Sequence, residues 1–195
     1  MALITVAEAK TLIPSLSGTS DDTLLTTLIG QAGVAMARYC GYPGDAPTME
    51  SASYTRDLDG NGTREIWLDV WPATAITSVY DDPDLDFAAA SLVASGSYSI
   101  VDKRRLRLTS TAAQGTWTEG TGTVRVTYTA GFATVPDDLK SLCALQVRHM
   151  YDRRQTQGKT SVSGGQSNIG LVDPAWLAEE VKQGLMELRL PRSYL

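Results

Sequence analysis

The sequence has few of the residues that enzymes most often use for catalysis. Its 195 residues include one histidine, His149, and two cysteines, Cys40 and Cys143, and no G-x-S-x-G motif is present. General acid–base catalysis depends on histidine or on paired carboxylates in a desolvated pocket, and nucleophilic catalysis depends on an activated serine or cysteine. We therefore predict a protein without catalytic residues, cofactors or metal ions. The alternative, an enzyme with an unfamiliar active site, would need a deep pocket that holds carboxylates with strongly perturbed pKa values.

Long apolar runs are also missing. No stretch approaches the roughly 18 uninterrupted apolar residues of a membrane-spanning helix, and the first five residues lack the basic start and apolar core of a signal peptide. We therefore expect a protein that is made in the cytoplasm and has no membrane partner. In that reducing compartment, Cys40 and Cys143 are expected to be small buried thiols instead of a disulfide.

An excess of positive charge is the third absence. Seventeen basic residues against 22 acidic ones give a net charge of -5, and the pI is near 4.9. A protein that grips nucleic-acid phosphates normally carries a basic surface, so tight nucleic-acid binding is not expected. An acidic surface would instead let DNA pass without sticking, because like charges repel within a Debye length.

Three segments place apolar residues at the spacing of helices. Thr5 and Glu8 have the spacing of a capping box, which predicts a helix over residues 5–13. Further helices are predicted over residues 20–40 and 136–157. The expected buried faces of these two are formed by Leu24, Leu25, Leu28, Ile29, Ala32, Ala35, Met36 and Tyr39, and by Leu139, Leu142, Cys143, Val147 and Met150.

Between the second and third helices the apolar period changes to two. Glycine, asparagine, aspartate and proline interrupt the segment from about residue 50 to 132 at intervals typical of antiparallel strands. The path of residues 81–96 cannot be predicted from their aspartates, alanines and serines. The predicted fold class is α+β, with a small helical core and an antiparallel β insertion, both within a domain of residues 1–157.

The end of the chain is predicted to be separate from this domain. Residues 158–172 are rich in glycine, serine and threonine, which predicts a flexible linker before a C-terminal helix and tail at residues 173–195. Two interpretations are open: a detached helix that docks onto a neighbouring protein, or a helix folded back on its own domain. In the first interpretation the docking residues are Trp176, Leu177, Val181, Leu185, Leu188, Pro191 and Arg192.

Two motifs match ion or phosphate sites only in part. Residues 57–62, Asp-Leu-Asp-Gly-Asn-Gly, fit the first half of an EF-hand calcium loop, but Leu68 stands where the bidentate carboxylate is required. We expect a hairpin turn there. Residues 158–160, Gly-Lys-Thr, match the end of a P-loop, but Arg153 replaces its first glycine.

Basic residues cluster at two places in this acidic chain. In both clusters, a solvated surface and a contact with another subunit or with DNA phosphates are alternative interpretations. The residues are Lys103, Arg104, Arg105 and Arg107 in the β insertion, and Arg148, Arg153 and Arg154 near the end of the third predicted helix.

Several short segments, taken in order, point to a known family. They are Leu68-x-x-Trp71-Pro72 with Ile76 and Ser78-Val79, Val126-x-Tyr128-x-Ala130-Gly131-Phe132, Val135-Pro136-x-Asp138-Leu139-Lys140, His149-x-Tyr151-x-x-Arg154 and Leu190-Pro191-Arg192. Together with the order of elements, they resemble the head-tail connector (adaptor) proteins of long-tailed bacteriophages and phage-like gene transfer agents.

The resemblance implies a structural role at the head-tail junction of a phage, prophage or gene transfer agent particle. It implies a homo-oligomeric ring of about twelve copies, between the portal protein and the next head-completion or tail protein. The C-terminal segment would reach into the portal or adjacent subunits. DNA would pass through the lumen without sequence-specific binding.

A DNA-binding regulatory protein is the alternative from another class. It is suggested by the helix-turn-helix look of residues 5–13 and 20–40. A salt-sensitive mobility shift at physiological ionic strength would support it, although the acidic pI argues against it.

Overall fold

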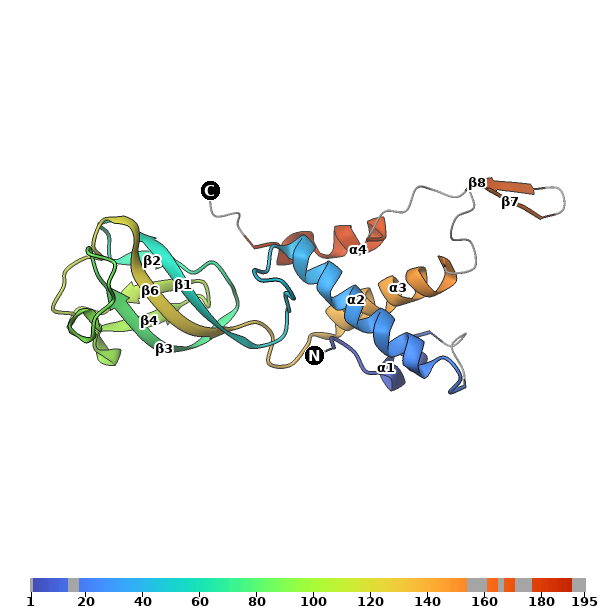
Figure 1. Cartoon of the computed structure of the whole chain (residues 1–195), viewed down its shortest axis with the longest axis horizontal. Helices are drawn as coiled ribbons and strands as arrows, with labels where there is room; N and C mark the ends of the chain where they lie inside the picture. Colours follow the sequence, from blue (N-terminus) through green and yellow to red (C-terminus); the bar gives the residue numbers. More distant parts are fainter. Residues whose placement is uncertain (1, 14–17, 154–160, 165–166, 171–176, 191–195) are drawn as a thin grey trace. The chain divides into compact units, whose positions relative to one another are not determined.

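The protein consists of a helical unit and a β unit (Figure 1). The computed structural model describes residues 2–13, 18–153, 161–164, 167–170 and 177–190. The helical unit contains Met1–Met49 and Thr134–Arg189, and the β unit contains Glu50–Ala133 with Leu190. The β unit is thus inserted between two parts of the helical unit, and the predicted α+β class with an antiparallel β insertion is confirmed.

The N-terminal helices begin and end where the sequence predicts, to within two residues. Helix α1 spans Val6–Leu12, and its capping box is complete, because Thr5 accepts a hydrogen bond from the Glu8 amide and Glu8 accepts one from the Thr5 amide. Helix α2 spans Asp22–Cys40 and ends at Gly41, whose φ of 90° suits glycine.

Helix α3, Asp137–Arg153, packs against both N-terminal helices. Residues 154–157 of the predicted helix lie outside the described residues. Most of the predicted apolar faces are buried, but Leu24 is 36% exposed, and Leu28, Tyr39, Leu142 and Met150 are half-buried. The buried core of the helical unit includes Leu25, Ile29, Ala32, Met36, Leu139, Cys143 and Val147.

The segment predicted as a linker contains two short strands. Strand β7, Ser161–Gly164, pairs with β8, Ser167–Gly170, in an antiparallel hairpin. The flexibility that the composition indicates stays a prediction. Helix α4 spans Glu179–Gly184 and is followed by a 3-10 turn, η3, at Met186–Leu188.

Helix α4 differs from its prediction. It begins at Glu179, because Leu177 and Ala178 are not helical, and it packs on α3 instead of being detached. The physical reason is its apolar face, which is covered by α3 of the same chain. Of the two interpretations left open by the sequence, the structure has the helix folded back on its own core.

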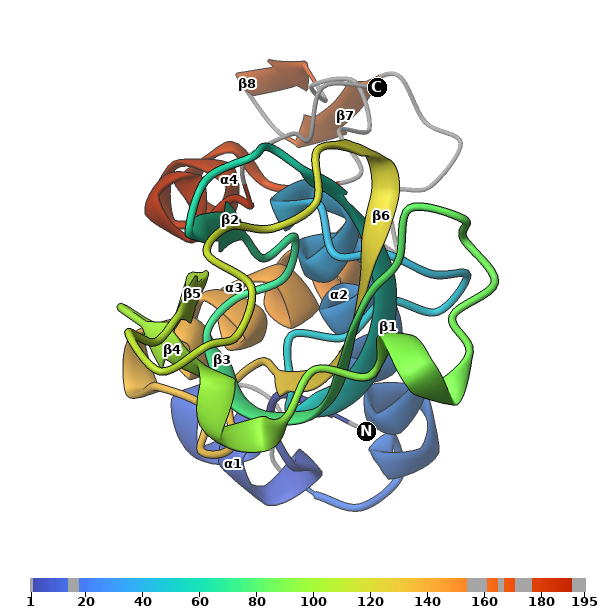
Figure 2. The same cartoon turned by 90° about the vertical axis from the view of Figure 1, so that its left-hand side faces the viewer.

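The β unit is built from two three-stranded antiparallel sheets. One has the order β1-β6-β3 and the other the order β2-β5-β4. Figure 2 looks onto this unit, with β1 and β6 on the right of the view and β4 and β5 on the left. The strands are β1 Ala52–Gly60, β2 Glu65–Trp67, β3 Ala73–Asp81, β4 Tyr98–Val101, β5 Arg105–Leu108 and β6 Gly120–Ala130.

Alternation along the strands gives each sheet one buried and one outer face. In β6, Val124, Val126 and Tyr128 are buried, and Arg125 and Thr127 between them lie on the outer face. In the second sheet Ile66, Leu106 and Ile100 are in register and face the core. The two buried faces line one core, whose largest side chains include Trp117, Tyr128, Ile66, Leu68, Leu106 and Leu108.

Polar groups inside this core have partners. The Tyr128 hydroxyl accepts a hydrogen bond of 3.0 Å from the Val70 amide, and burial raises the pKa of Tyr128 to about 12. The Trp117 indole N–H donates to the Arg64 carbonyl at 3.2 Å. A buried hydroxyl or indole N–H needs such a partner, so these bonds help to fix the two sheets around the core.

One prediction about a connection was wrong. Residues 57–62, predicted as a hairpin turn, do not join a hairpin, because residues 57–60 belong to β1, which pairs with β6, and the next strand, β2, pairs with β5. The segment after β3, whose path the sequence left open, forms a loop and two 3-10 turns, η1 Ala89–Ser91 and η2 Ser95–Ser97.

Candidate interaction surfaces

The predicted docking helix has most of its apolar residues buried within its own chain. Leu177, Val181 and Leu185 are 4%, 0% and 0% exposed. Leu188 is half-buried. Trp176, Pro191 and Arg192 lie outside the described residues.

Two contacts with α3 fix α4 in place. The Ala178 amide donates a buried hydrogen bond of 3.0 Å to the side-chain carbonyl of Gln146, which is itself fully buried. Gly184 lies so close to Leu142 that an added Cβ would stand 2.7 Å from one of its methyl groups. The buried face of α4 is therefore part of the helical core, and docking by this helix would have to use its other residues.

The first basic cluster, residues 103–107, lies in a turn and in the strand after it. Asp102 and Lys103 both have positive φ, 52° and 56°, and lie in the turn between β4 and β5. Such φ values at two successive residues are typical of tight hairpin turns. Arg104 lies over the Trp71 ring, with its guanidinium carbon 4.0 Å from the ring centroid.

Acidic neighbours neutralise part of this cluster. Arg105 donates to Asp102 at 2.5 Å and to Glu65 at 2.6 Å, and these hydrogen bonds and charges raise its pKa. The Arg107 Nε lies 3.4 Å from the second oxygen of Glu65, and the Arg107 side chain stays 56% exposed. The cluster is therefore a mixed surface with a net positive charge.

The second basic cluster is less concentrated. Arg148 is exposed and lies 3.6 Å from Asp152, one turn further along α3. Arg153 is the last residue of α3, and Arg154 lies outside the described residues. His149 is half-buried, and burial together with the Arg153 charge lowers its pKa.

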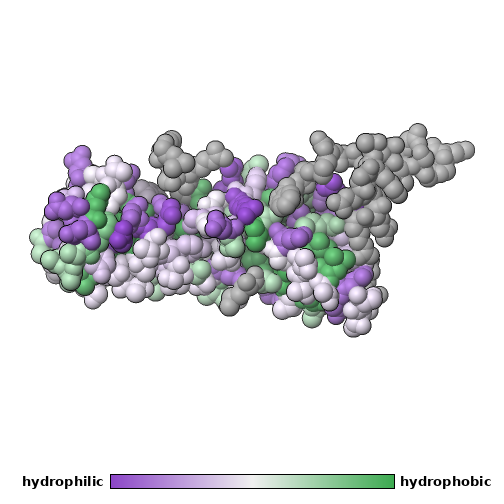
Figure 3. All heavy atoms as spheres, viewed as in Figure 1, coloured by the Kyte–Doolittle hydropathy of each residue, from purple (hydrophilic) through white to green (hydrophobic). Residues whose placement is uncertain are grey.

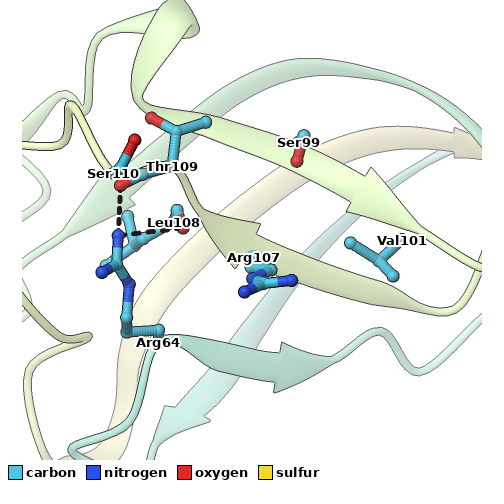
Figure 4. Close-up of a pocket in the computed structure, with 7 residues that line it drawn as sticks. All are labelled: Arg64, Ser99, Val101, Arg107, Leu108, Thr109 and Ser110. Atoms are coloured by element: carbon cyan, nitrogen blue, oxygen red, sulfur yellow. Dashed lines mark hydrogen bonds between the residues drawn. The ribbon is translucent and has the colours of Figure 1, made fainter.

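The outer face of the β2-β5-β4 sheet carries an open pocket, called here the arginine pocket (Figure 4). Its volume is about 340 Å³, and Arg64 and Arg107 contribute its charged groups. Val101 adds apolar surface, and Leu108, which is only 1% exposed, completes the lining together with three serine and threonine residues. Arg64 is fixed by bonds from its Nη2 to the carbonyls of Leu108 and Thr109.

An exposed tryptophan lies on the same outer face. Trp67 is 62% exposed, and the Arg105 guanidinium carbon lies 5.6 Å from its ring centroid. Exposed tryptophan next to arginine is typical of the residues that dominate binding at protein interfaces. This face therefore combines apolar surface with fixed cations, which suits an acidic and partly apolar protein segment.

The sequence prediction missed Arg64 and Trp67. The alternation in β2 was a usable signal for Trp67, because Ile66 and Leu68 on either side are buried. Arg64 gave no such signal, since it joins Arg107 only through the pairing of β2 with β5.

Apolar side chains also reach the surface elsewhere. Figure 3 shows apolar residues at the surface of both units in the view that it presents. The large exposed ones in the described residues are Leu12, Leu24, Leu145 and Met186 in the helical unit, and Trp67, Leu85 and Leu92 in the β unit.

The residues of the partial calcium motif are engaged in other contacts. Asp57 holds the Arg125 guanidinium through two bonds of 2.6 and 2.8 Å, which lowers the pKa of Asp57, and Asp59 accepts the Gly122 amide at 2.8 Å. No group of three or more histidine, cysteine or acidic residues in the described ranges is arranged to hold a metal ion. In the same ranges, no helix is both long and apolar enough to span a membrane.

Comparison with known proteins gives one family and a set of similar folds. Residues 2–183 match the model of the family described as head completion protein. Among curated proteins, none matches this chain.

The similar solved structures are chains of gene transfer agent (GTA) particles. A chain in the neck of an empty GTA particle, computed with C6 symmetry, is 19% identical with a TM-score of 0.60, and the match covers 98% of this chain and 92% of that one. A chain of the native GTA virion is 18% identical with a TM-score of 0.58, at the same coverage. A chain in the neck of a native particle, computed with C12 symmetry, is 17% identical with a TM-score of 0.55, over 100% and 96% of the two chains.

Proposed function

We propose that this chain, which belongs to the head completion protein family, is a structural subunit of the neck of a tailed phage or gene transfer agent particle. In this role it joins head to tail by binding its neighbours, and it catalyses no reaction. The observation that carries the proposal is the family match over residues 2–183, together with a fold shared along nearly the whole chain with neck proteins of GTA particles.

Copies of the chain form a ring under the portal protein in this proposal. The similar neck chains come from assemblies computed with C6 and C12 symmetry, which supports a closed cyclic arrangement of about six or about twelve copies. A ring contact between neighbours needs a total buried area of about 1,200 Å² or more. The β unit offers outer faces on two sheets for such contacts.

Contact with the portal is assigned to the end of the chain. Because Leu177, Val181 and Leu185 are buried against α3, the portal contact would use Leu188 together with Trp176, Pro191 and Arg192, which precede and follow these residues in the sequence. In this proposal helix α4, which packs on α3, connects the docking residues to the rest of the subunit.

Passage of DNA through the ring is consistent with the charge of the chain. Each copy carries a net charge of -5, so a ring of copies would carry a net negative charge, which repels the DNA backbone. The alternative, a DNA-binding regulator, gains no support from the structure, because α2 carries Arg38 as its one basic residue. A helix that enters a DNA groove normally brings several basic or amide side chains to it.

Deleting the gene in cells that produce the particles tests the proposal. We expect DNA-filled heads and free tails to accumulate, and complete particles to return when the gene is supplied from a plasmid. Complete particles in the absence of the gene would contradict the proposal. A mobility shift with double-stranded DNA that persists at physiological salt would instead favour the regulator.

A further inference from the structure

An acidic loop, residues 82–88, protrudes from the end of β3 in a fixed conformation. The Asp82 carboxylate accepts hydrogen bonds from the amides of Asp84 at 2.9 Å and Phe87 at 2.8 Å. Asp86 accepts the Ala88 amide at 2.9 Å. These bonds hold the loop closed on itself, so its tip is ordered before it meets a partner.

The loop tip presents an apolar side chain between two carboxylates. Leu85 is 50% exposed, and Asp84 and Asp86 on either side are exposed too. Leu85 and Phe87 have φ values of 62° and 50°, a region that bulky residues rarely adopt. Such conformations persist where the surroundings impose them, and they concentrate at functional sites.

The acidic loop is anchored to the outer face of the β1-β6-β3 sheet. The Arg125 guanidinium carbon lies 3.7 Å from the centroid of the Phe87 ring, and the same guanidinium binds Asp57 of β1. Arg125 alternates with buried Val124 and Val126, so it lies on the outer side of its sheet.

The arginine pocket lies on the other side of the β unit. Arg107, Ser99 and Val101 alternate with the core residues Leu106, Leu108 and Ile100, so they are on the outer face of the β2-β5-β4 sheet. The two buried faces meet in the core, so the two outer faces point away from each other. The acidic loop therefore cannot bind the arginine pocket of its own chain.

From this arrangement we infer that, in the ring, the acidic loop of one copy inserts Leu85 into the arginine pocket of the next copy. The Asp84 and Asp86 carboxylates then approach the Arg64 and Arg107 guanidinium groups, and Leu85 contacts Val101. Two different surfaces on opposite sides of one subunit make a head-to-tail contact, which is the kind that closes a ring. This inference rests on the proposed function and specifies the neighbour that the pocket binds.

The test uses charge reversal and its rescue in cells that lack the chromosomal gene. Arg107→Glu alone and Asp84→Arg alone should each lower the yield of complete particles by at least about tenfold, because like charges then meet in the contact. The double variant Arg107→Glu/Asp84→Arg should restore the yield. Co-expression of the two single variants should restore it as well, since alternating copies then place opposite charges in every contact.

Controls separate this contact from misfolding and from unspecific charge effects. Leu85→Gly relieves the positive φ and should melt no lower than wild type, yet it removes the inserted side chain and should also lower the yield. Thr23→Glu/Gln31→Glu changes the net charge as much as Arg107→Glu does, at two exposed positions of α2, and should leave the yield unchanged.

The outcomes distinguish this inference from the proposed function. If Arg107→Glu, Asp84→Arg and Leu85→Gly all give complete particles at the wild-type yield, the inferred contact is wrong and the neck assignment stands. If the single reversals lower the yield but neither the double variant nor co-expression restores it, the contact is also overturned. If particles form without the gene, the proposed function itself fails.

Discussion

At the scale of single residues, Gly60 is a position where no side chain fits. It ends β1 opposite Gly120, and a Cβ added there would lie 1.7 Å from the backbone oxygen of Thr118. We predict that Gly60→Ala lowers the free energy of unfolding by about 2–3 kcal/mol, because the backbone must move to admit the methyl group. Chemical denaturation measures this, with Gly96→Ala as the control, since an added Cβ at Gly96 has no atom within 4 Å. Equal stability of the two variants would contradict the prediction.

The two cysteines give a second prediction at this scale. Burial raises the pKa of Cys40 to about 11, against the smaller opposing effect of Arg189, and burial raises that of Cys143 to about 12. Thiolate is the reactive form, so both thiols should be inert toward a disulfide reagent at pH 8 in the native protein. Both should react within the mixing time in denaturant. Rapid labelling of either thiol without denaturant would contradict the prediction, because it would show that this thiol is accessible in the native protein.

At the scale of elements, α4 is expected to contribute to the stability of the helical unit. Leu185 is fully buried, so Leu185→Ala should lower the free energy of unfolding by about 2–5 kcal/mol. The neighbouring Met186 is 58% exposed, so Met186→Ala should change it by less than about 0.5 kcal/mol. Thermal and urea unfolding of the two variants compare adjacent positions directly. If Leu185→Ala is as stable as wild type, α4 is not part of this core.

The contact between α1 and α3 depends on pH. The Glu8 carboxylate binds the Lys140 ammonium at 2.8 Å and accepts a hydrogen bond from the Thr5 amide. The hydrogen bond to Lys140, and then those to Thr5, lower the pKa of Glu8 from 4.5 to about 2. A lowered folded-state pKa stabilises the fold above the unfolded value, and this contribution is lost as the pH falls from 4.5 toward 2. The stability difference between wild type and Glu8→Gln should therefore shrink over that range. A difference that stays constant from pH 7 to pH 2.5 would contradict the assigned role of Glu8.

Some elements could be predicted from the sequence and others could not. Helices α1 and α2 followed from local signals, the Thr5 and Glu8 capping box and Gly41, because capping is decided by neighbours in the chain. The pairing of β1 with β6, 72 residues apart at Thr55 and Thr127, has no local signal, so the turn after β1 was taken for a hairpin. Periodicity located the apolar face of α4, but it does not identify the surface that covers that face.

The same limit applies to the candidate surfaces. The basic residues at 103–107 were visible as a run in the sequence, whereas Arg64 joins them only through strand pairing. Asp102 and Glu65, which neutralise part of the run, are brought to it by the turn and by register. The acidic loop was unpredictable because its shape depends on hydrogen bonds to the Asp82 carboxylate and on the Arg125 contact from another strand.

At the scale of the whole molecule, the proposed function requires several surfaces that can bind neighbouring subunits. In the described residues, large apolar side chains are exposed on both units. The β unit also carries the acidic loop on one face and the arginine pocket on the opposite face. These are features of binding surfaces. The family match over residues 2–183 places the chain among the head completion proteins.

Electron cryomicroscopy of purified complete particles tests the central claim most directly. We predict that the neck, reconstructed with cyclic symmetry, contains a ring into which the helical unit and the β unit of this chain fit, one copy in each asymmetric unit. Density in which neither unit can be placed, in particles whose mass spectra also lack the chain, would contradict the account.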